Sequence, residues 1–211
     1  MARKTKEEAL KTREAILNAA IELFFAHGIA RTSLSDIASE AKVTRGAIYW
    51  HFKNKEDLVE ALWEQLLALF EPIDRVSENP DETDSLGKLH HSYDRFFSTL
   101  LNDSRTVKLF RIMRNKSDSA TGSDTFDIRR ISLFQTGRQK IEKILQNSVR
   151  HGQLPENHDV RLGSIAILAF IDGLVHQCVM FPDMMRADRD IPALLDSLDA
   201  MLKFGCVKAG R

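Results

Sequence analysis

Two large aromatic side chains and an arginine crowd one short predicted helix near the N-terminus. Residues 44–51 contain Arg45, Tyr49 and Trp50, whereas Ile48 is the residue whose spacing turns it inward. Exposing such side chains on a two-turn helix is costly unless a partner covers them. A second short helix and a tight turn come just before, and together they make a helix-turn-helix, whose second helix enters the DNA major groove. These residues predict a DNA-binding surface.

Packing offers an alternative explanation for part of this cluster. Trp50 and Phe52 would serve equally well to hold the small domain against the next helix, whereas we assign Arg45 and Tyr49 to DNA. Lys4 belongs to a basic N-terminal segment that would act as a flexible arm on DNA phosphates. A solvated basic tail has the same composition.

Basic residues are concentrated in this same part of the chain. The 30 Lys and Arg residues balance 30 Asp and Glu residues, yet residues 1–55 hold 10 basic and 6 acidic side chains, against 20 and 24 in the remainder. Such an end is typical of polyanion binding. No apolar secretion signal opens the chain, and Cys178 and Cys206 lack a CxxC motif or a disulfide framework. We therefore expect a cytoplasmic protein with two free thiols.

A carboxylate and an imidazole lie one helical turn apart in an apolar stretch of the C-terminal half. Asp172 and His176 interrupt residues 162–181, which argues against a membrane span. A carboxylate in an apolar helix needs a partner or water, and His176 would supply it or make a second polar contact to a ligand. The pair would be the acid and base of an enzyme, but no third group completes such a site.

Signatures of catalysis and of metal binding are missing elsewhere too. The sequence has no HExxH, GxSxG, GxGxxG or GxxxxGK[ST] motif. His90 and His91 have no acidic neighbour at metal-ligand spacing. We therefore predict a protein that is not an enzyme and that uses no metal and no cofactor.

Apolar residues recur at helical spacing in almost every segment, and five prolines and ten glycines are too few for a loop-rich β-protein. We therefore predict an all-α fold of about nine helices. Polar residues 77–85 form a linker, and residues 117–125 form a loop. The predicted helices cover about residues 7–28, 33–41, 44–51, 55–72, 86–101, 105–115, 126–149, 158–181 and 188–206.

Aromatic and methionine side chains are frequent in the central helices, at spacings that one narrow core seam cannot satisfy. Such side chains line cavities that re-pack around varied apolar ligands, and an ordinary bundle core is the alternative for any single one. The candidate ligand-binding residues are Trp63, Leu67, Phe97, Phe110, Met113, Phe134, Asp172 and His176.

Small residues give the predicted helix at 158–181 a face suited to close helix contact. Together with residues 188–206 this face fits a four-helix bundle between two copies of the chain, that is, a homodimer. Tight packing inside one subunit is the alternative. The candidate interface residues are Ala166, Ala169, Gly173, Leu195, Leu198 and Leu202.

The motifs of the N-terminal region resemble one family. The stretches RTSLSDIA at 31–38 and AKVTRGAIYWHFKNKEDL at 41–58 look like the signature of the TetR family of bacterial repressors. The pairing of an Arg-Gly dipeptide with Tyr-Trp-His is similar to the branch that represses multidrug efflux pumps. The strong match covers about residues 1–63, and the remainder matches weakly.

The resemblance implies an all-α homodimer with a three-helix, helix-turn-helix DNA-binding domain over residues 1–54 and a helical ligand-binding and dimerisation domain over 55–211. It implies that Ser33 caps its helix against a phosphate and that Lys55 binds another. Trp63 and Asp172 resemble pocket positions of that branch. The implied contacts to base edges or phosphates come from Thr44, Arg45, Gly46, Tyr49 and His51.

Elementary chemistry agrees with these assignments. Arginine reads guanine O6 and N7 with two hydrogen bonds, tyrosine contacts a phosphate or a thymine methyl group, and Gly46 lets the backbone approach.

By this resemblance the protein is expected to be a transcriptional repressor that binds a pseudo-palindromic, double-stranded operator as a dimer. Small amphipathic or cationic compounds would release it. Because that branch represses multidrug efflux pumps, the expected target is a multidrug efflux operon. The alternative is a DNA-binding protein of the same fold without a small-molecule inducer, whose C-terminal domain would be filled rather than hollow.

Overall fold

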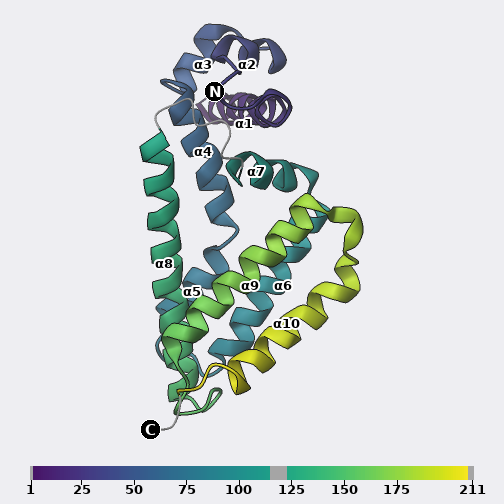
Figure 1. Cartoon of the computed structure of the whole chain (residues 1–211). Coiled ribbons are helices and arrows are strands. Elements are labelled where there is room, and N and C mark those ends of the chain that lie inside the picture. The colour runs from purple at the N-terminus through teal and green to yellow at the C-terminus, as the bar shows by residue number, and fades with distance from the viewer. Residues whose placement is uncertain (1, 115–122, 209–211) are drawn as a thin grey trace. The chain divides into compact units, whose positions relative to one another are not determined.

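The computed structural model describes residues 2–114 and 123–208, with backbone alone at 2–5, 123–130 and 187. The described residues form ten α-helices and no β-strand, which confirms the all-α prediction (Figure 1). The helices are α1 (Ala2–His27), α2 (Leu34–Glu40), α3 (Arg45–His51), α4 (Lys55–Ala68), α5 (Glu71–Glu78), α6 (Ser85–Asn102), α7 (Ser104–Arg114), α8 (Ser123–Arg150), α9 (Val160–Met180) and α10 (Ala187–Phe204).

Two compact units divide the chain. The first, here called the head, comprises Met1–Ala68 and Ser104–Ser123, and the second, the body, comprises Leu69–Asp103 and Asp124–Arg211. The predicted boundary between residues 54 and 55 does not coincide with these units, because α4 and α7 pack together and α7 also packs on α1. The head therefore contains five helices, and the three-helix DNA-binding domain over residues 1–54 stays a prediction.

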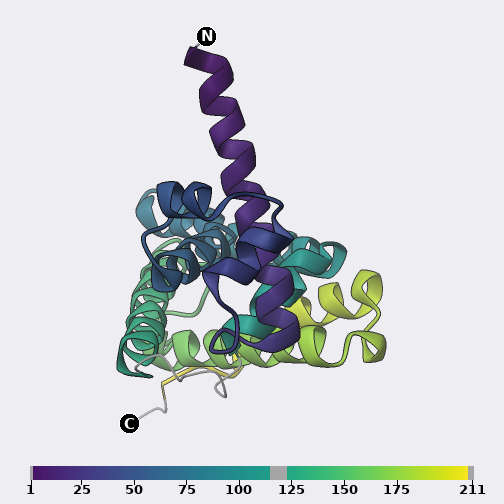
Figure 2. The same ribbon diagram turned by 90° about the horizontal axis from the view of Figure 1, so that it is seen from above.

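The head is built around α1. This helix buries one face, with Ile16, Leu17 and Ile21 fully enclosed, and α2, α3 and α7 all pack against it. Its N-terminal turns project beyond the short helices as one continuous rod (Figure 2). The helix starts at Ala2 rather than at about residue 7. The side chain of Lys4, the predicted arm residue, lies outside the described side chains.

Polar contacts attach α7 to α1 and α4 within the head. The Arg105 guanidinium donates through Nε to Asn18 Oδ1 of α1 and through Nη2 to Gln65 Oε1 of α4, both at 2.7 Å. One turn later, Lys108 Nζ lies 2.6 Å from a carboxylate oxygen of Glu22. The residues that hold α7 in the head thus come from two other helices.

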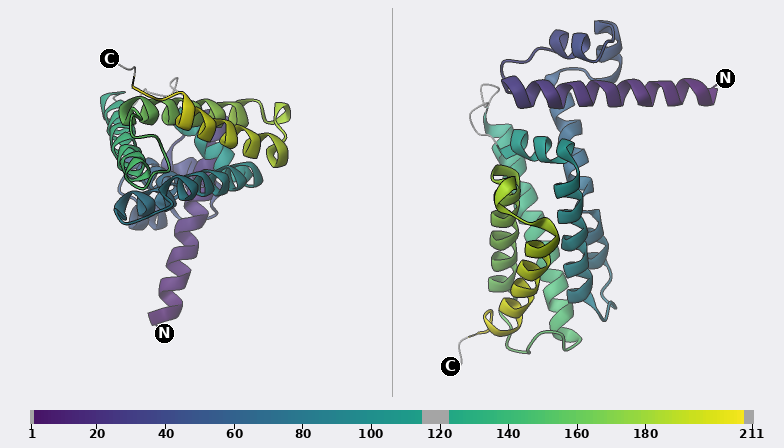
Figure 3. Two further views of the ribbon diagram at one scale, coloured as in Figure 1. Left: turned by 90° about the horizontal axis from the view of Figure 1, so that it is seen from below. Right: turned by 90° about the vertical axis from the view of Figure 1, so that its right-hand side faces the viewer.

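The body packs α6 against α5 and α10, and α9 against α10. Helices α9 and α10 run side by side in opposite directions and are joined through a short 3-10 turn at Pro182–Met184 (Figure 3). Asp84 caps α6 by accepting from the Gly87 amide at 3.2 Å. A Cβ at position 87 would lie 2.5 Å from that carboxylate, so a larger residue there would require the Asp84 side chain to move.

One predicted element boundary is wrong for a clear reason. Pro72 was expected to end the helix that starts at residue 55, but it lies in the first turn of α5, which the sequence analysis did not anticipate. Proline is favoured in the first turn, where its missing N–H has no helical partner to lose. Of the predicted loop at 117–125, residues 117–122 lie outside the described residues and 123–125 belong to α8.

A buried histidine holds the end of α10 against the start of α9. His158 is buried, and its Nε2 would lie 2.6 Å from a Cβ at position 163, so that Gly163 makes room for the ring. Burial lowers the pKa of His158, although the Leu202 backbone and the Asp159 carboxylate oppose part of this shift. Neither ring nitrogen has a hydrogen bond of normal geometry. The ring is therefore packed in its neutral form.

This burial predicts acid sensitivity of the fold. Because the pKa is lower in the folded than in the unfolded chain, the unfolded chain binds the proton first, and stability falls as the pH drops below about 6.5. Denaturant unfolding at pH 7.5 and 5.5 measures the loss. His158→Gln should lose part of this pH dependence, while the control His91→Gln, at an exposed position, should keep it. Equal pH dependence in both variants would contradict the prediction.

Candidate nucleic-acid interface

Helix α2 begins with a reciprocal cap. Ser33 Oγ accepts from the Asp36 amide at 3.2 Å, and the Ser33 amide donates to Asp36 Oδ2 at 2.8 Å. Ser33 Oγ also donates to Asp36 Oδ2 at 2.7 Å, and this hydrogen bond, followed by that of the Ser33 amide, holds the pKa of Asp36 below its usual value. A serine followed three residues later by an acidic residue favours this capping box, and it fixes where α2 starts.

The turn into α3 is equally well specified. The Val43 amide donates to Ala38 O at 3.0 Å, Lys42 adopts a left-handed backbone with φ of 55°, and the Thr44 side chain accepts from the Ala47 amide at 3.1 Å. Ile48 is fully buried, as expected. One side of α3 is thereby fixed to the head, and the other side is left to solvent.

The outward side of α3 carries the residues assigned to DNA. Tyr49 and Trp50 are 52% and 73% exposed, and Arg45 and Gly46 are exposed as well. The structure distinguishes between packing and DNA contact for the aromatic residues Trp50 and Phe52. Phe52 is buried in the head, whereas Trp50 is exposed. An aromatic surface of this kind on a two-turn helix is suited to a partner.

His51 lies at the edge of this surface. Its ring meets that of Trp50 edge to face, with 4.5 Å between centroids. Burial, and then the positive charge of Arg13, lower the pKa of His51. The guanidinium of Arg13 itself lies 4.9 Å from the ring centroid of Phe52. A neutral His51 offers a hydrogen bond to a base or a phosphate rather than a charge.

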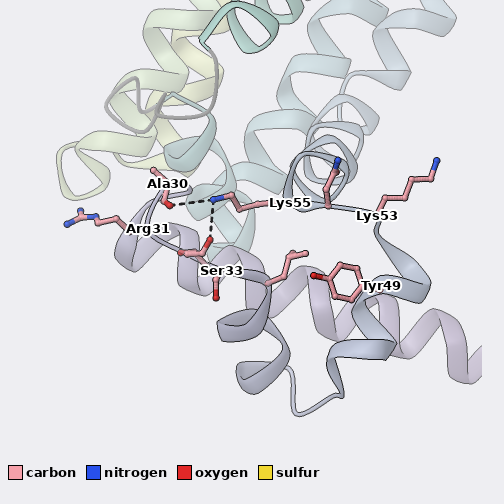
Figure 4. A pocket seen from close by; sticks show the side chains of 9 residues that line it. Ala30, Arg31, Ser33, Tyr49, Lys53 and Lys55 are labelled. Carbon is pink, nitrogen blue, oxygen red and sulfur yellow. Dashed lines mark hydrogen bonds between the residues drawn. The ribbon is translucent and has the colours of Figure 1, made fainter.

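A hollow of about 350 Å³ lies beside α3 on the head. It is open to solvent and is lined by the turn between α1 and α2, the start of α2, Tyr49 and the connection from α3 to α4 (Figure 4). The Tyr49 side chain points its hydroxyl toward the turn. Arg31 and Lys53 also line the hollow, and neither was singled out from the sequence. The sequence does contain a signal for them, because both are basic residues that flank the two short helices.

Lys55 occupies the same region in a different way. Its Nζ donates to three backbone carbonyls of the turn, those of Ile29, Ala30 and Thr32. The side chain is half-buried, whereas Lys53 is exposed. The assignment of Lys55 to a phosphate, taken from the resemblance, stays a prediction that this geometry does not favour.

The residues assigned to a ligand divide between the two units. Those of the head are on α4 and α7, which pack together, and all but Leu67 are buried. In the body Phe97 is fully buried, whereas Phe134 is half exposed. The ligand assignment stays a prediction. The head holds Trp63, Leu67, Phe110 and Met113, and the body holds Phe97, Phe134, Asp172 and His176.

Asp172 is less enclosed than its apolar surroundings in the sequence suggested. It is half-buried on α9, as is His176, whose ring centroid lies 6.1 Å from that of Phe181. The expectation of a carboxylate buried in an apolar cavity therefore needs correction: in the chain alone, water reaches it.

The two helices assigned to the dimer interface expose only part of the predicted set. Ala169 and Gly173 are exposed on α9 and Ala166 is partly exposed, and Leu162, Ile165 and Met180 extend this face. A Cβ at Gly173 would meet no atom within 4 Å in the part of the chain that the structure describes. The assignment of three leucines of α10 to the interface must be corrected, because these side chains are buried in the core of their own subunit. They are Leu195, Leu198 and Leu202.

The exposed face of α9 also accounts for its composition. By length and apolar content Val160–Met180 is a candidate membrane span, and 44% of its most apolar window is buried inside the structure. A helix with one face in the core and a second against another subunit has the same composition.

Comparisons with known proteins agree with this geometry. Residues 16–62 match the model of bacterial regulatory proteins of the tetR family, and residues 89–204 match that of the C-terminal region of MAATS-type transcriptional repressors. The chain is 38% identical to the HTH-type transcriptional regulator TtgR of Pseudomonas putida over 203 residues, which cover 96% of this chain and 97% of TtgR.

Two solved structures have the same fold. SmeT in complex with triclosan is 31% identical, with a TM-score of 0.81 over 95% of this chain and 96% of SmeT. SmeT is described as the repressor of the Stenotrophomonas maltophilia multidrug efflux pump SmeDEF. NalD, the secondary repressor of the MexAB-OprM multidrug efflux pump in Pseudomonas aeruginosa, is 29% identical, with a TM-score of 0.78 over 94% of this chain and 99% of NalD.

Proposed function

The chain belongs to the TetR family of bacterial transcriptional regulators, and we propose that it represses a multidrug efflux operon by binding a pseudo-palindromic operator as a homodimer. It is a regulator and not an enzyme, so the acid-base alternative for Asp172 and His176 is discarded. The observation that carries the DNA-binding proposal is the exposed side of α3, where Arg45, Tyr49 and Trp50 stand together.

The head supplies both kinds of DNA contact. Arg45 reads bases in the major groove, while Tyr49, Lys53 and Arg31 surround a hollow suited to a backbone phosphate. The structural helix cap at Ser33 presents the start of α2 to the same hollow. Base contacts give the sequence preference, and phosphate contacts set the register of the head on the duplex.

The exposed face of α9 supports the dimer. A glycine in a helix interior is less favourable than alanine by about 1 kcal/mol, and no neighbour of Gly173 among the described residues requires the absence of a side chain. Close approach of a second copy gives such a requirement. Leu162, Ile165 and Met180 would then be covered by the partner rather than by water.

Small amphipathic or cationic compounds act as inducers in this proposal, and the protein works in the cytoplasm, where its operator lies. Two relatives are repressors of multidrug efflux pumps, and one of them was solved with triclosan. Asp172 is the carboxylate that favours a cation, and the aromatic side chains supply apolar contact. The inducer must bind one conformation better than another, because equal affinity would shift nothing.

Trp50 provides a direct test of the DNA-binding surface. Operator DNA should change the fluorescence of the exposed Trp50 and leave Trp63, which is 8% exposed, nearly unaffected. The change should be absent in Trp50→Phe and present in Trp63→Phe, measured by titration with the DNA that footprinting identifies upstream of the gene. An inducing cationic dye should reverse it. An unchanged Trp50 signal in a footprinted complex would show that α3 does not face DNA.

A further inference from the structure

The ammonium group of Lys55 is enclosed by the turn that joins α1 to α2. Its Nζ lies 2.8 Å from Ile29 O, 3.2 Å from Thr32 O and 3.4 Å from Ala30 O. Figure 4 shows the side chain reaching toward this turn, while Lys53 extends away from it. An ammonium ion has three N–H donors and no acceptor. Each donor of Lys55 is thus matched by one carbonyl oxygen.

The turn itself is tightly built around these carbonyls. It starts at Gly28, whose φ of +83° is a left-handed conformation that glycine adopts without strain. Thr32 is buried and donates through Oγ1 to Gly28 O at 2.9 Å. Ile29 is buried as well. Three carbonyl dipoles that point to one place repel each other unless a cation lies between them, and Lys55 is that cation.

The same turn presents two groups at the hollow beside α3. Arg31 donates through Nε to His27 O at 3.0 Å, and the rest of this exposed side chain faces solvent. Ser33 forms the cap of α2 two residues later. The positions of Arg31 and Ser33 relative to Tyr49 therefore depend on how firmly the turn is held.

A phosphate contact by Lys55 would compete with this arrangement. Every proton of the ammonium group already has a carbonyl acceptor, so a phosphate oxygen would have to displace one. Lys53 has the better position for a phosphate, because it is exposed and lines the hollow. The two lysines, two residues apart, have different tasks.

We propose that Lys55 is a positioning residue for DNA binding: it fixes the turn between α1 and α2, and thereby Arg31 and Ser33, and it does not bind phosphate itself. The proposal rests on DNA binding by the head. It also explains how the first residue of α4 influences the position of α2, since its ammonium group holds the turn that leads into α2. Any shift of this end of α4 moves the three carbonyls with it.

Substitution of the two lysines separates positioning from phosphate binding. We expect Lys55→Met to speed amide hydrogen exchange at residues 29–34 in the free protein and to weaken operator binding by about tenfold or more, as for loss of hydrogen bonds to a charged group. Lys55→Arg should bind the operator nearly as weakly as Lys55→Met, because a planar guanidinium cannot direct its donors to three converging carbonyl oxygens. Lys53 is the matched control at the same surface.

The control variants are expected to behave in the opposite way. Lys53→Met should leave exchange in the turn unchanged and lower the salt slope of operator binding by about 2 for a dimer, one phosphate per subunit. Lys53→Arg should bind as the unchanged protein does. The proposal fails if Lys55→Arg restores operator affinity, since arginine replaces lysine well at a phosphate. It also fails if Lys55→Met leaves exchange of the turn amides unchanged.

Measurements on the unchanged protein keep the test valid even if Lys55→Met does not fold. The ¹⁵N signal of the Lys55 ammonium group should be protected from solvent exchange without DNA, and it should show no scalar coupling to a DNA phosphorus in the complex. Such a coupling, or an unprotected ammonium group, overturns the proposal. Operator binding by the unchanged protein is measured first, so that failure of DNA binding itself is recognised separately.

Discussion

Arg45→Ala is expected to abolish most of the preference for operator over random DNA. A bidentate contact to guanine contributes about 1–3 kcal/mol of discrimination, so the two half-sites together lose roughly 2–6 kcal/mol, or about 30-fold to 10⁴-fold in affinity. The exposed position of Arg45 at the start of α3 makes a stability effect small. Competition binding with operator and scrambled duplexes at one salt concentration measures the change.

Lys53→Ala is the matched control for this experiment. Lys53 is exposed and lines the hollow but lies outside α3, so its loss should weaken binding to both duplexes about equally. If Arg45→Ala also lowered both affinities by the same factor, Arg45 would be a phosphate contact and another residue of α3 would read the bases.

Ala169→Arg is expected to separate the dimer into monomers and to lower operator affinity at least about 100-fold, because one head then binds one half-site without the gain from linkage. Ala169 is exposed on α9, within the apolar face that includes Ile165 and Gly173. A guanidinium placed there would be taken out of water without a partner. Sedimentation velocity measures the oligomeric state, and a mobility-shift titration measures the affinity.

The control for the dimer experiment is Ser98→Arg, at an exposed position of α6 in the same unit. It should leave both the dimer and operator binding unchanged. An intact dimer of Ala169→Arg would place the interface on another face of the body, and Gly173 would then need a different explanation.

The local signals of the head made it predictable from the sequence. The cap of α2 at Ser33, the cap of α3 at Thr44 and the inward Ile48 all follow from residue types at fixed spacing, and the structure has each of them. Trp50 and Phe52 were harder to distinguish, because burial depends on which direction a side chain takes from a two-turn helix. Only three-dimensional packing separates them.

Long-range contacts account for what the sequence analysis missed. The carbonyls that hold Lys55 come from residues more than 20 positions earlier, and no periodicity indicates them. The leucines of α10 fit an interface and a core equally well by their spacing, and the packing of α6 on α10 decides for the core. Pro72 shows the same limit, since a proline ends one helix or starts the next.

The contribution of α7 to the head has a consequence for hybrid regulators. A hybrid joined after Ala68 would carry α1 to α4 but leave out the helix whose Arg105 binds Asn18 and Gln65. A relative's α7 would then have to fit those partners with its own side chains. Exchange of DNA specificity between relatives therefore requires transplanting two separate pieces of sequence, residues 1–68 and α7, as one cassette.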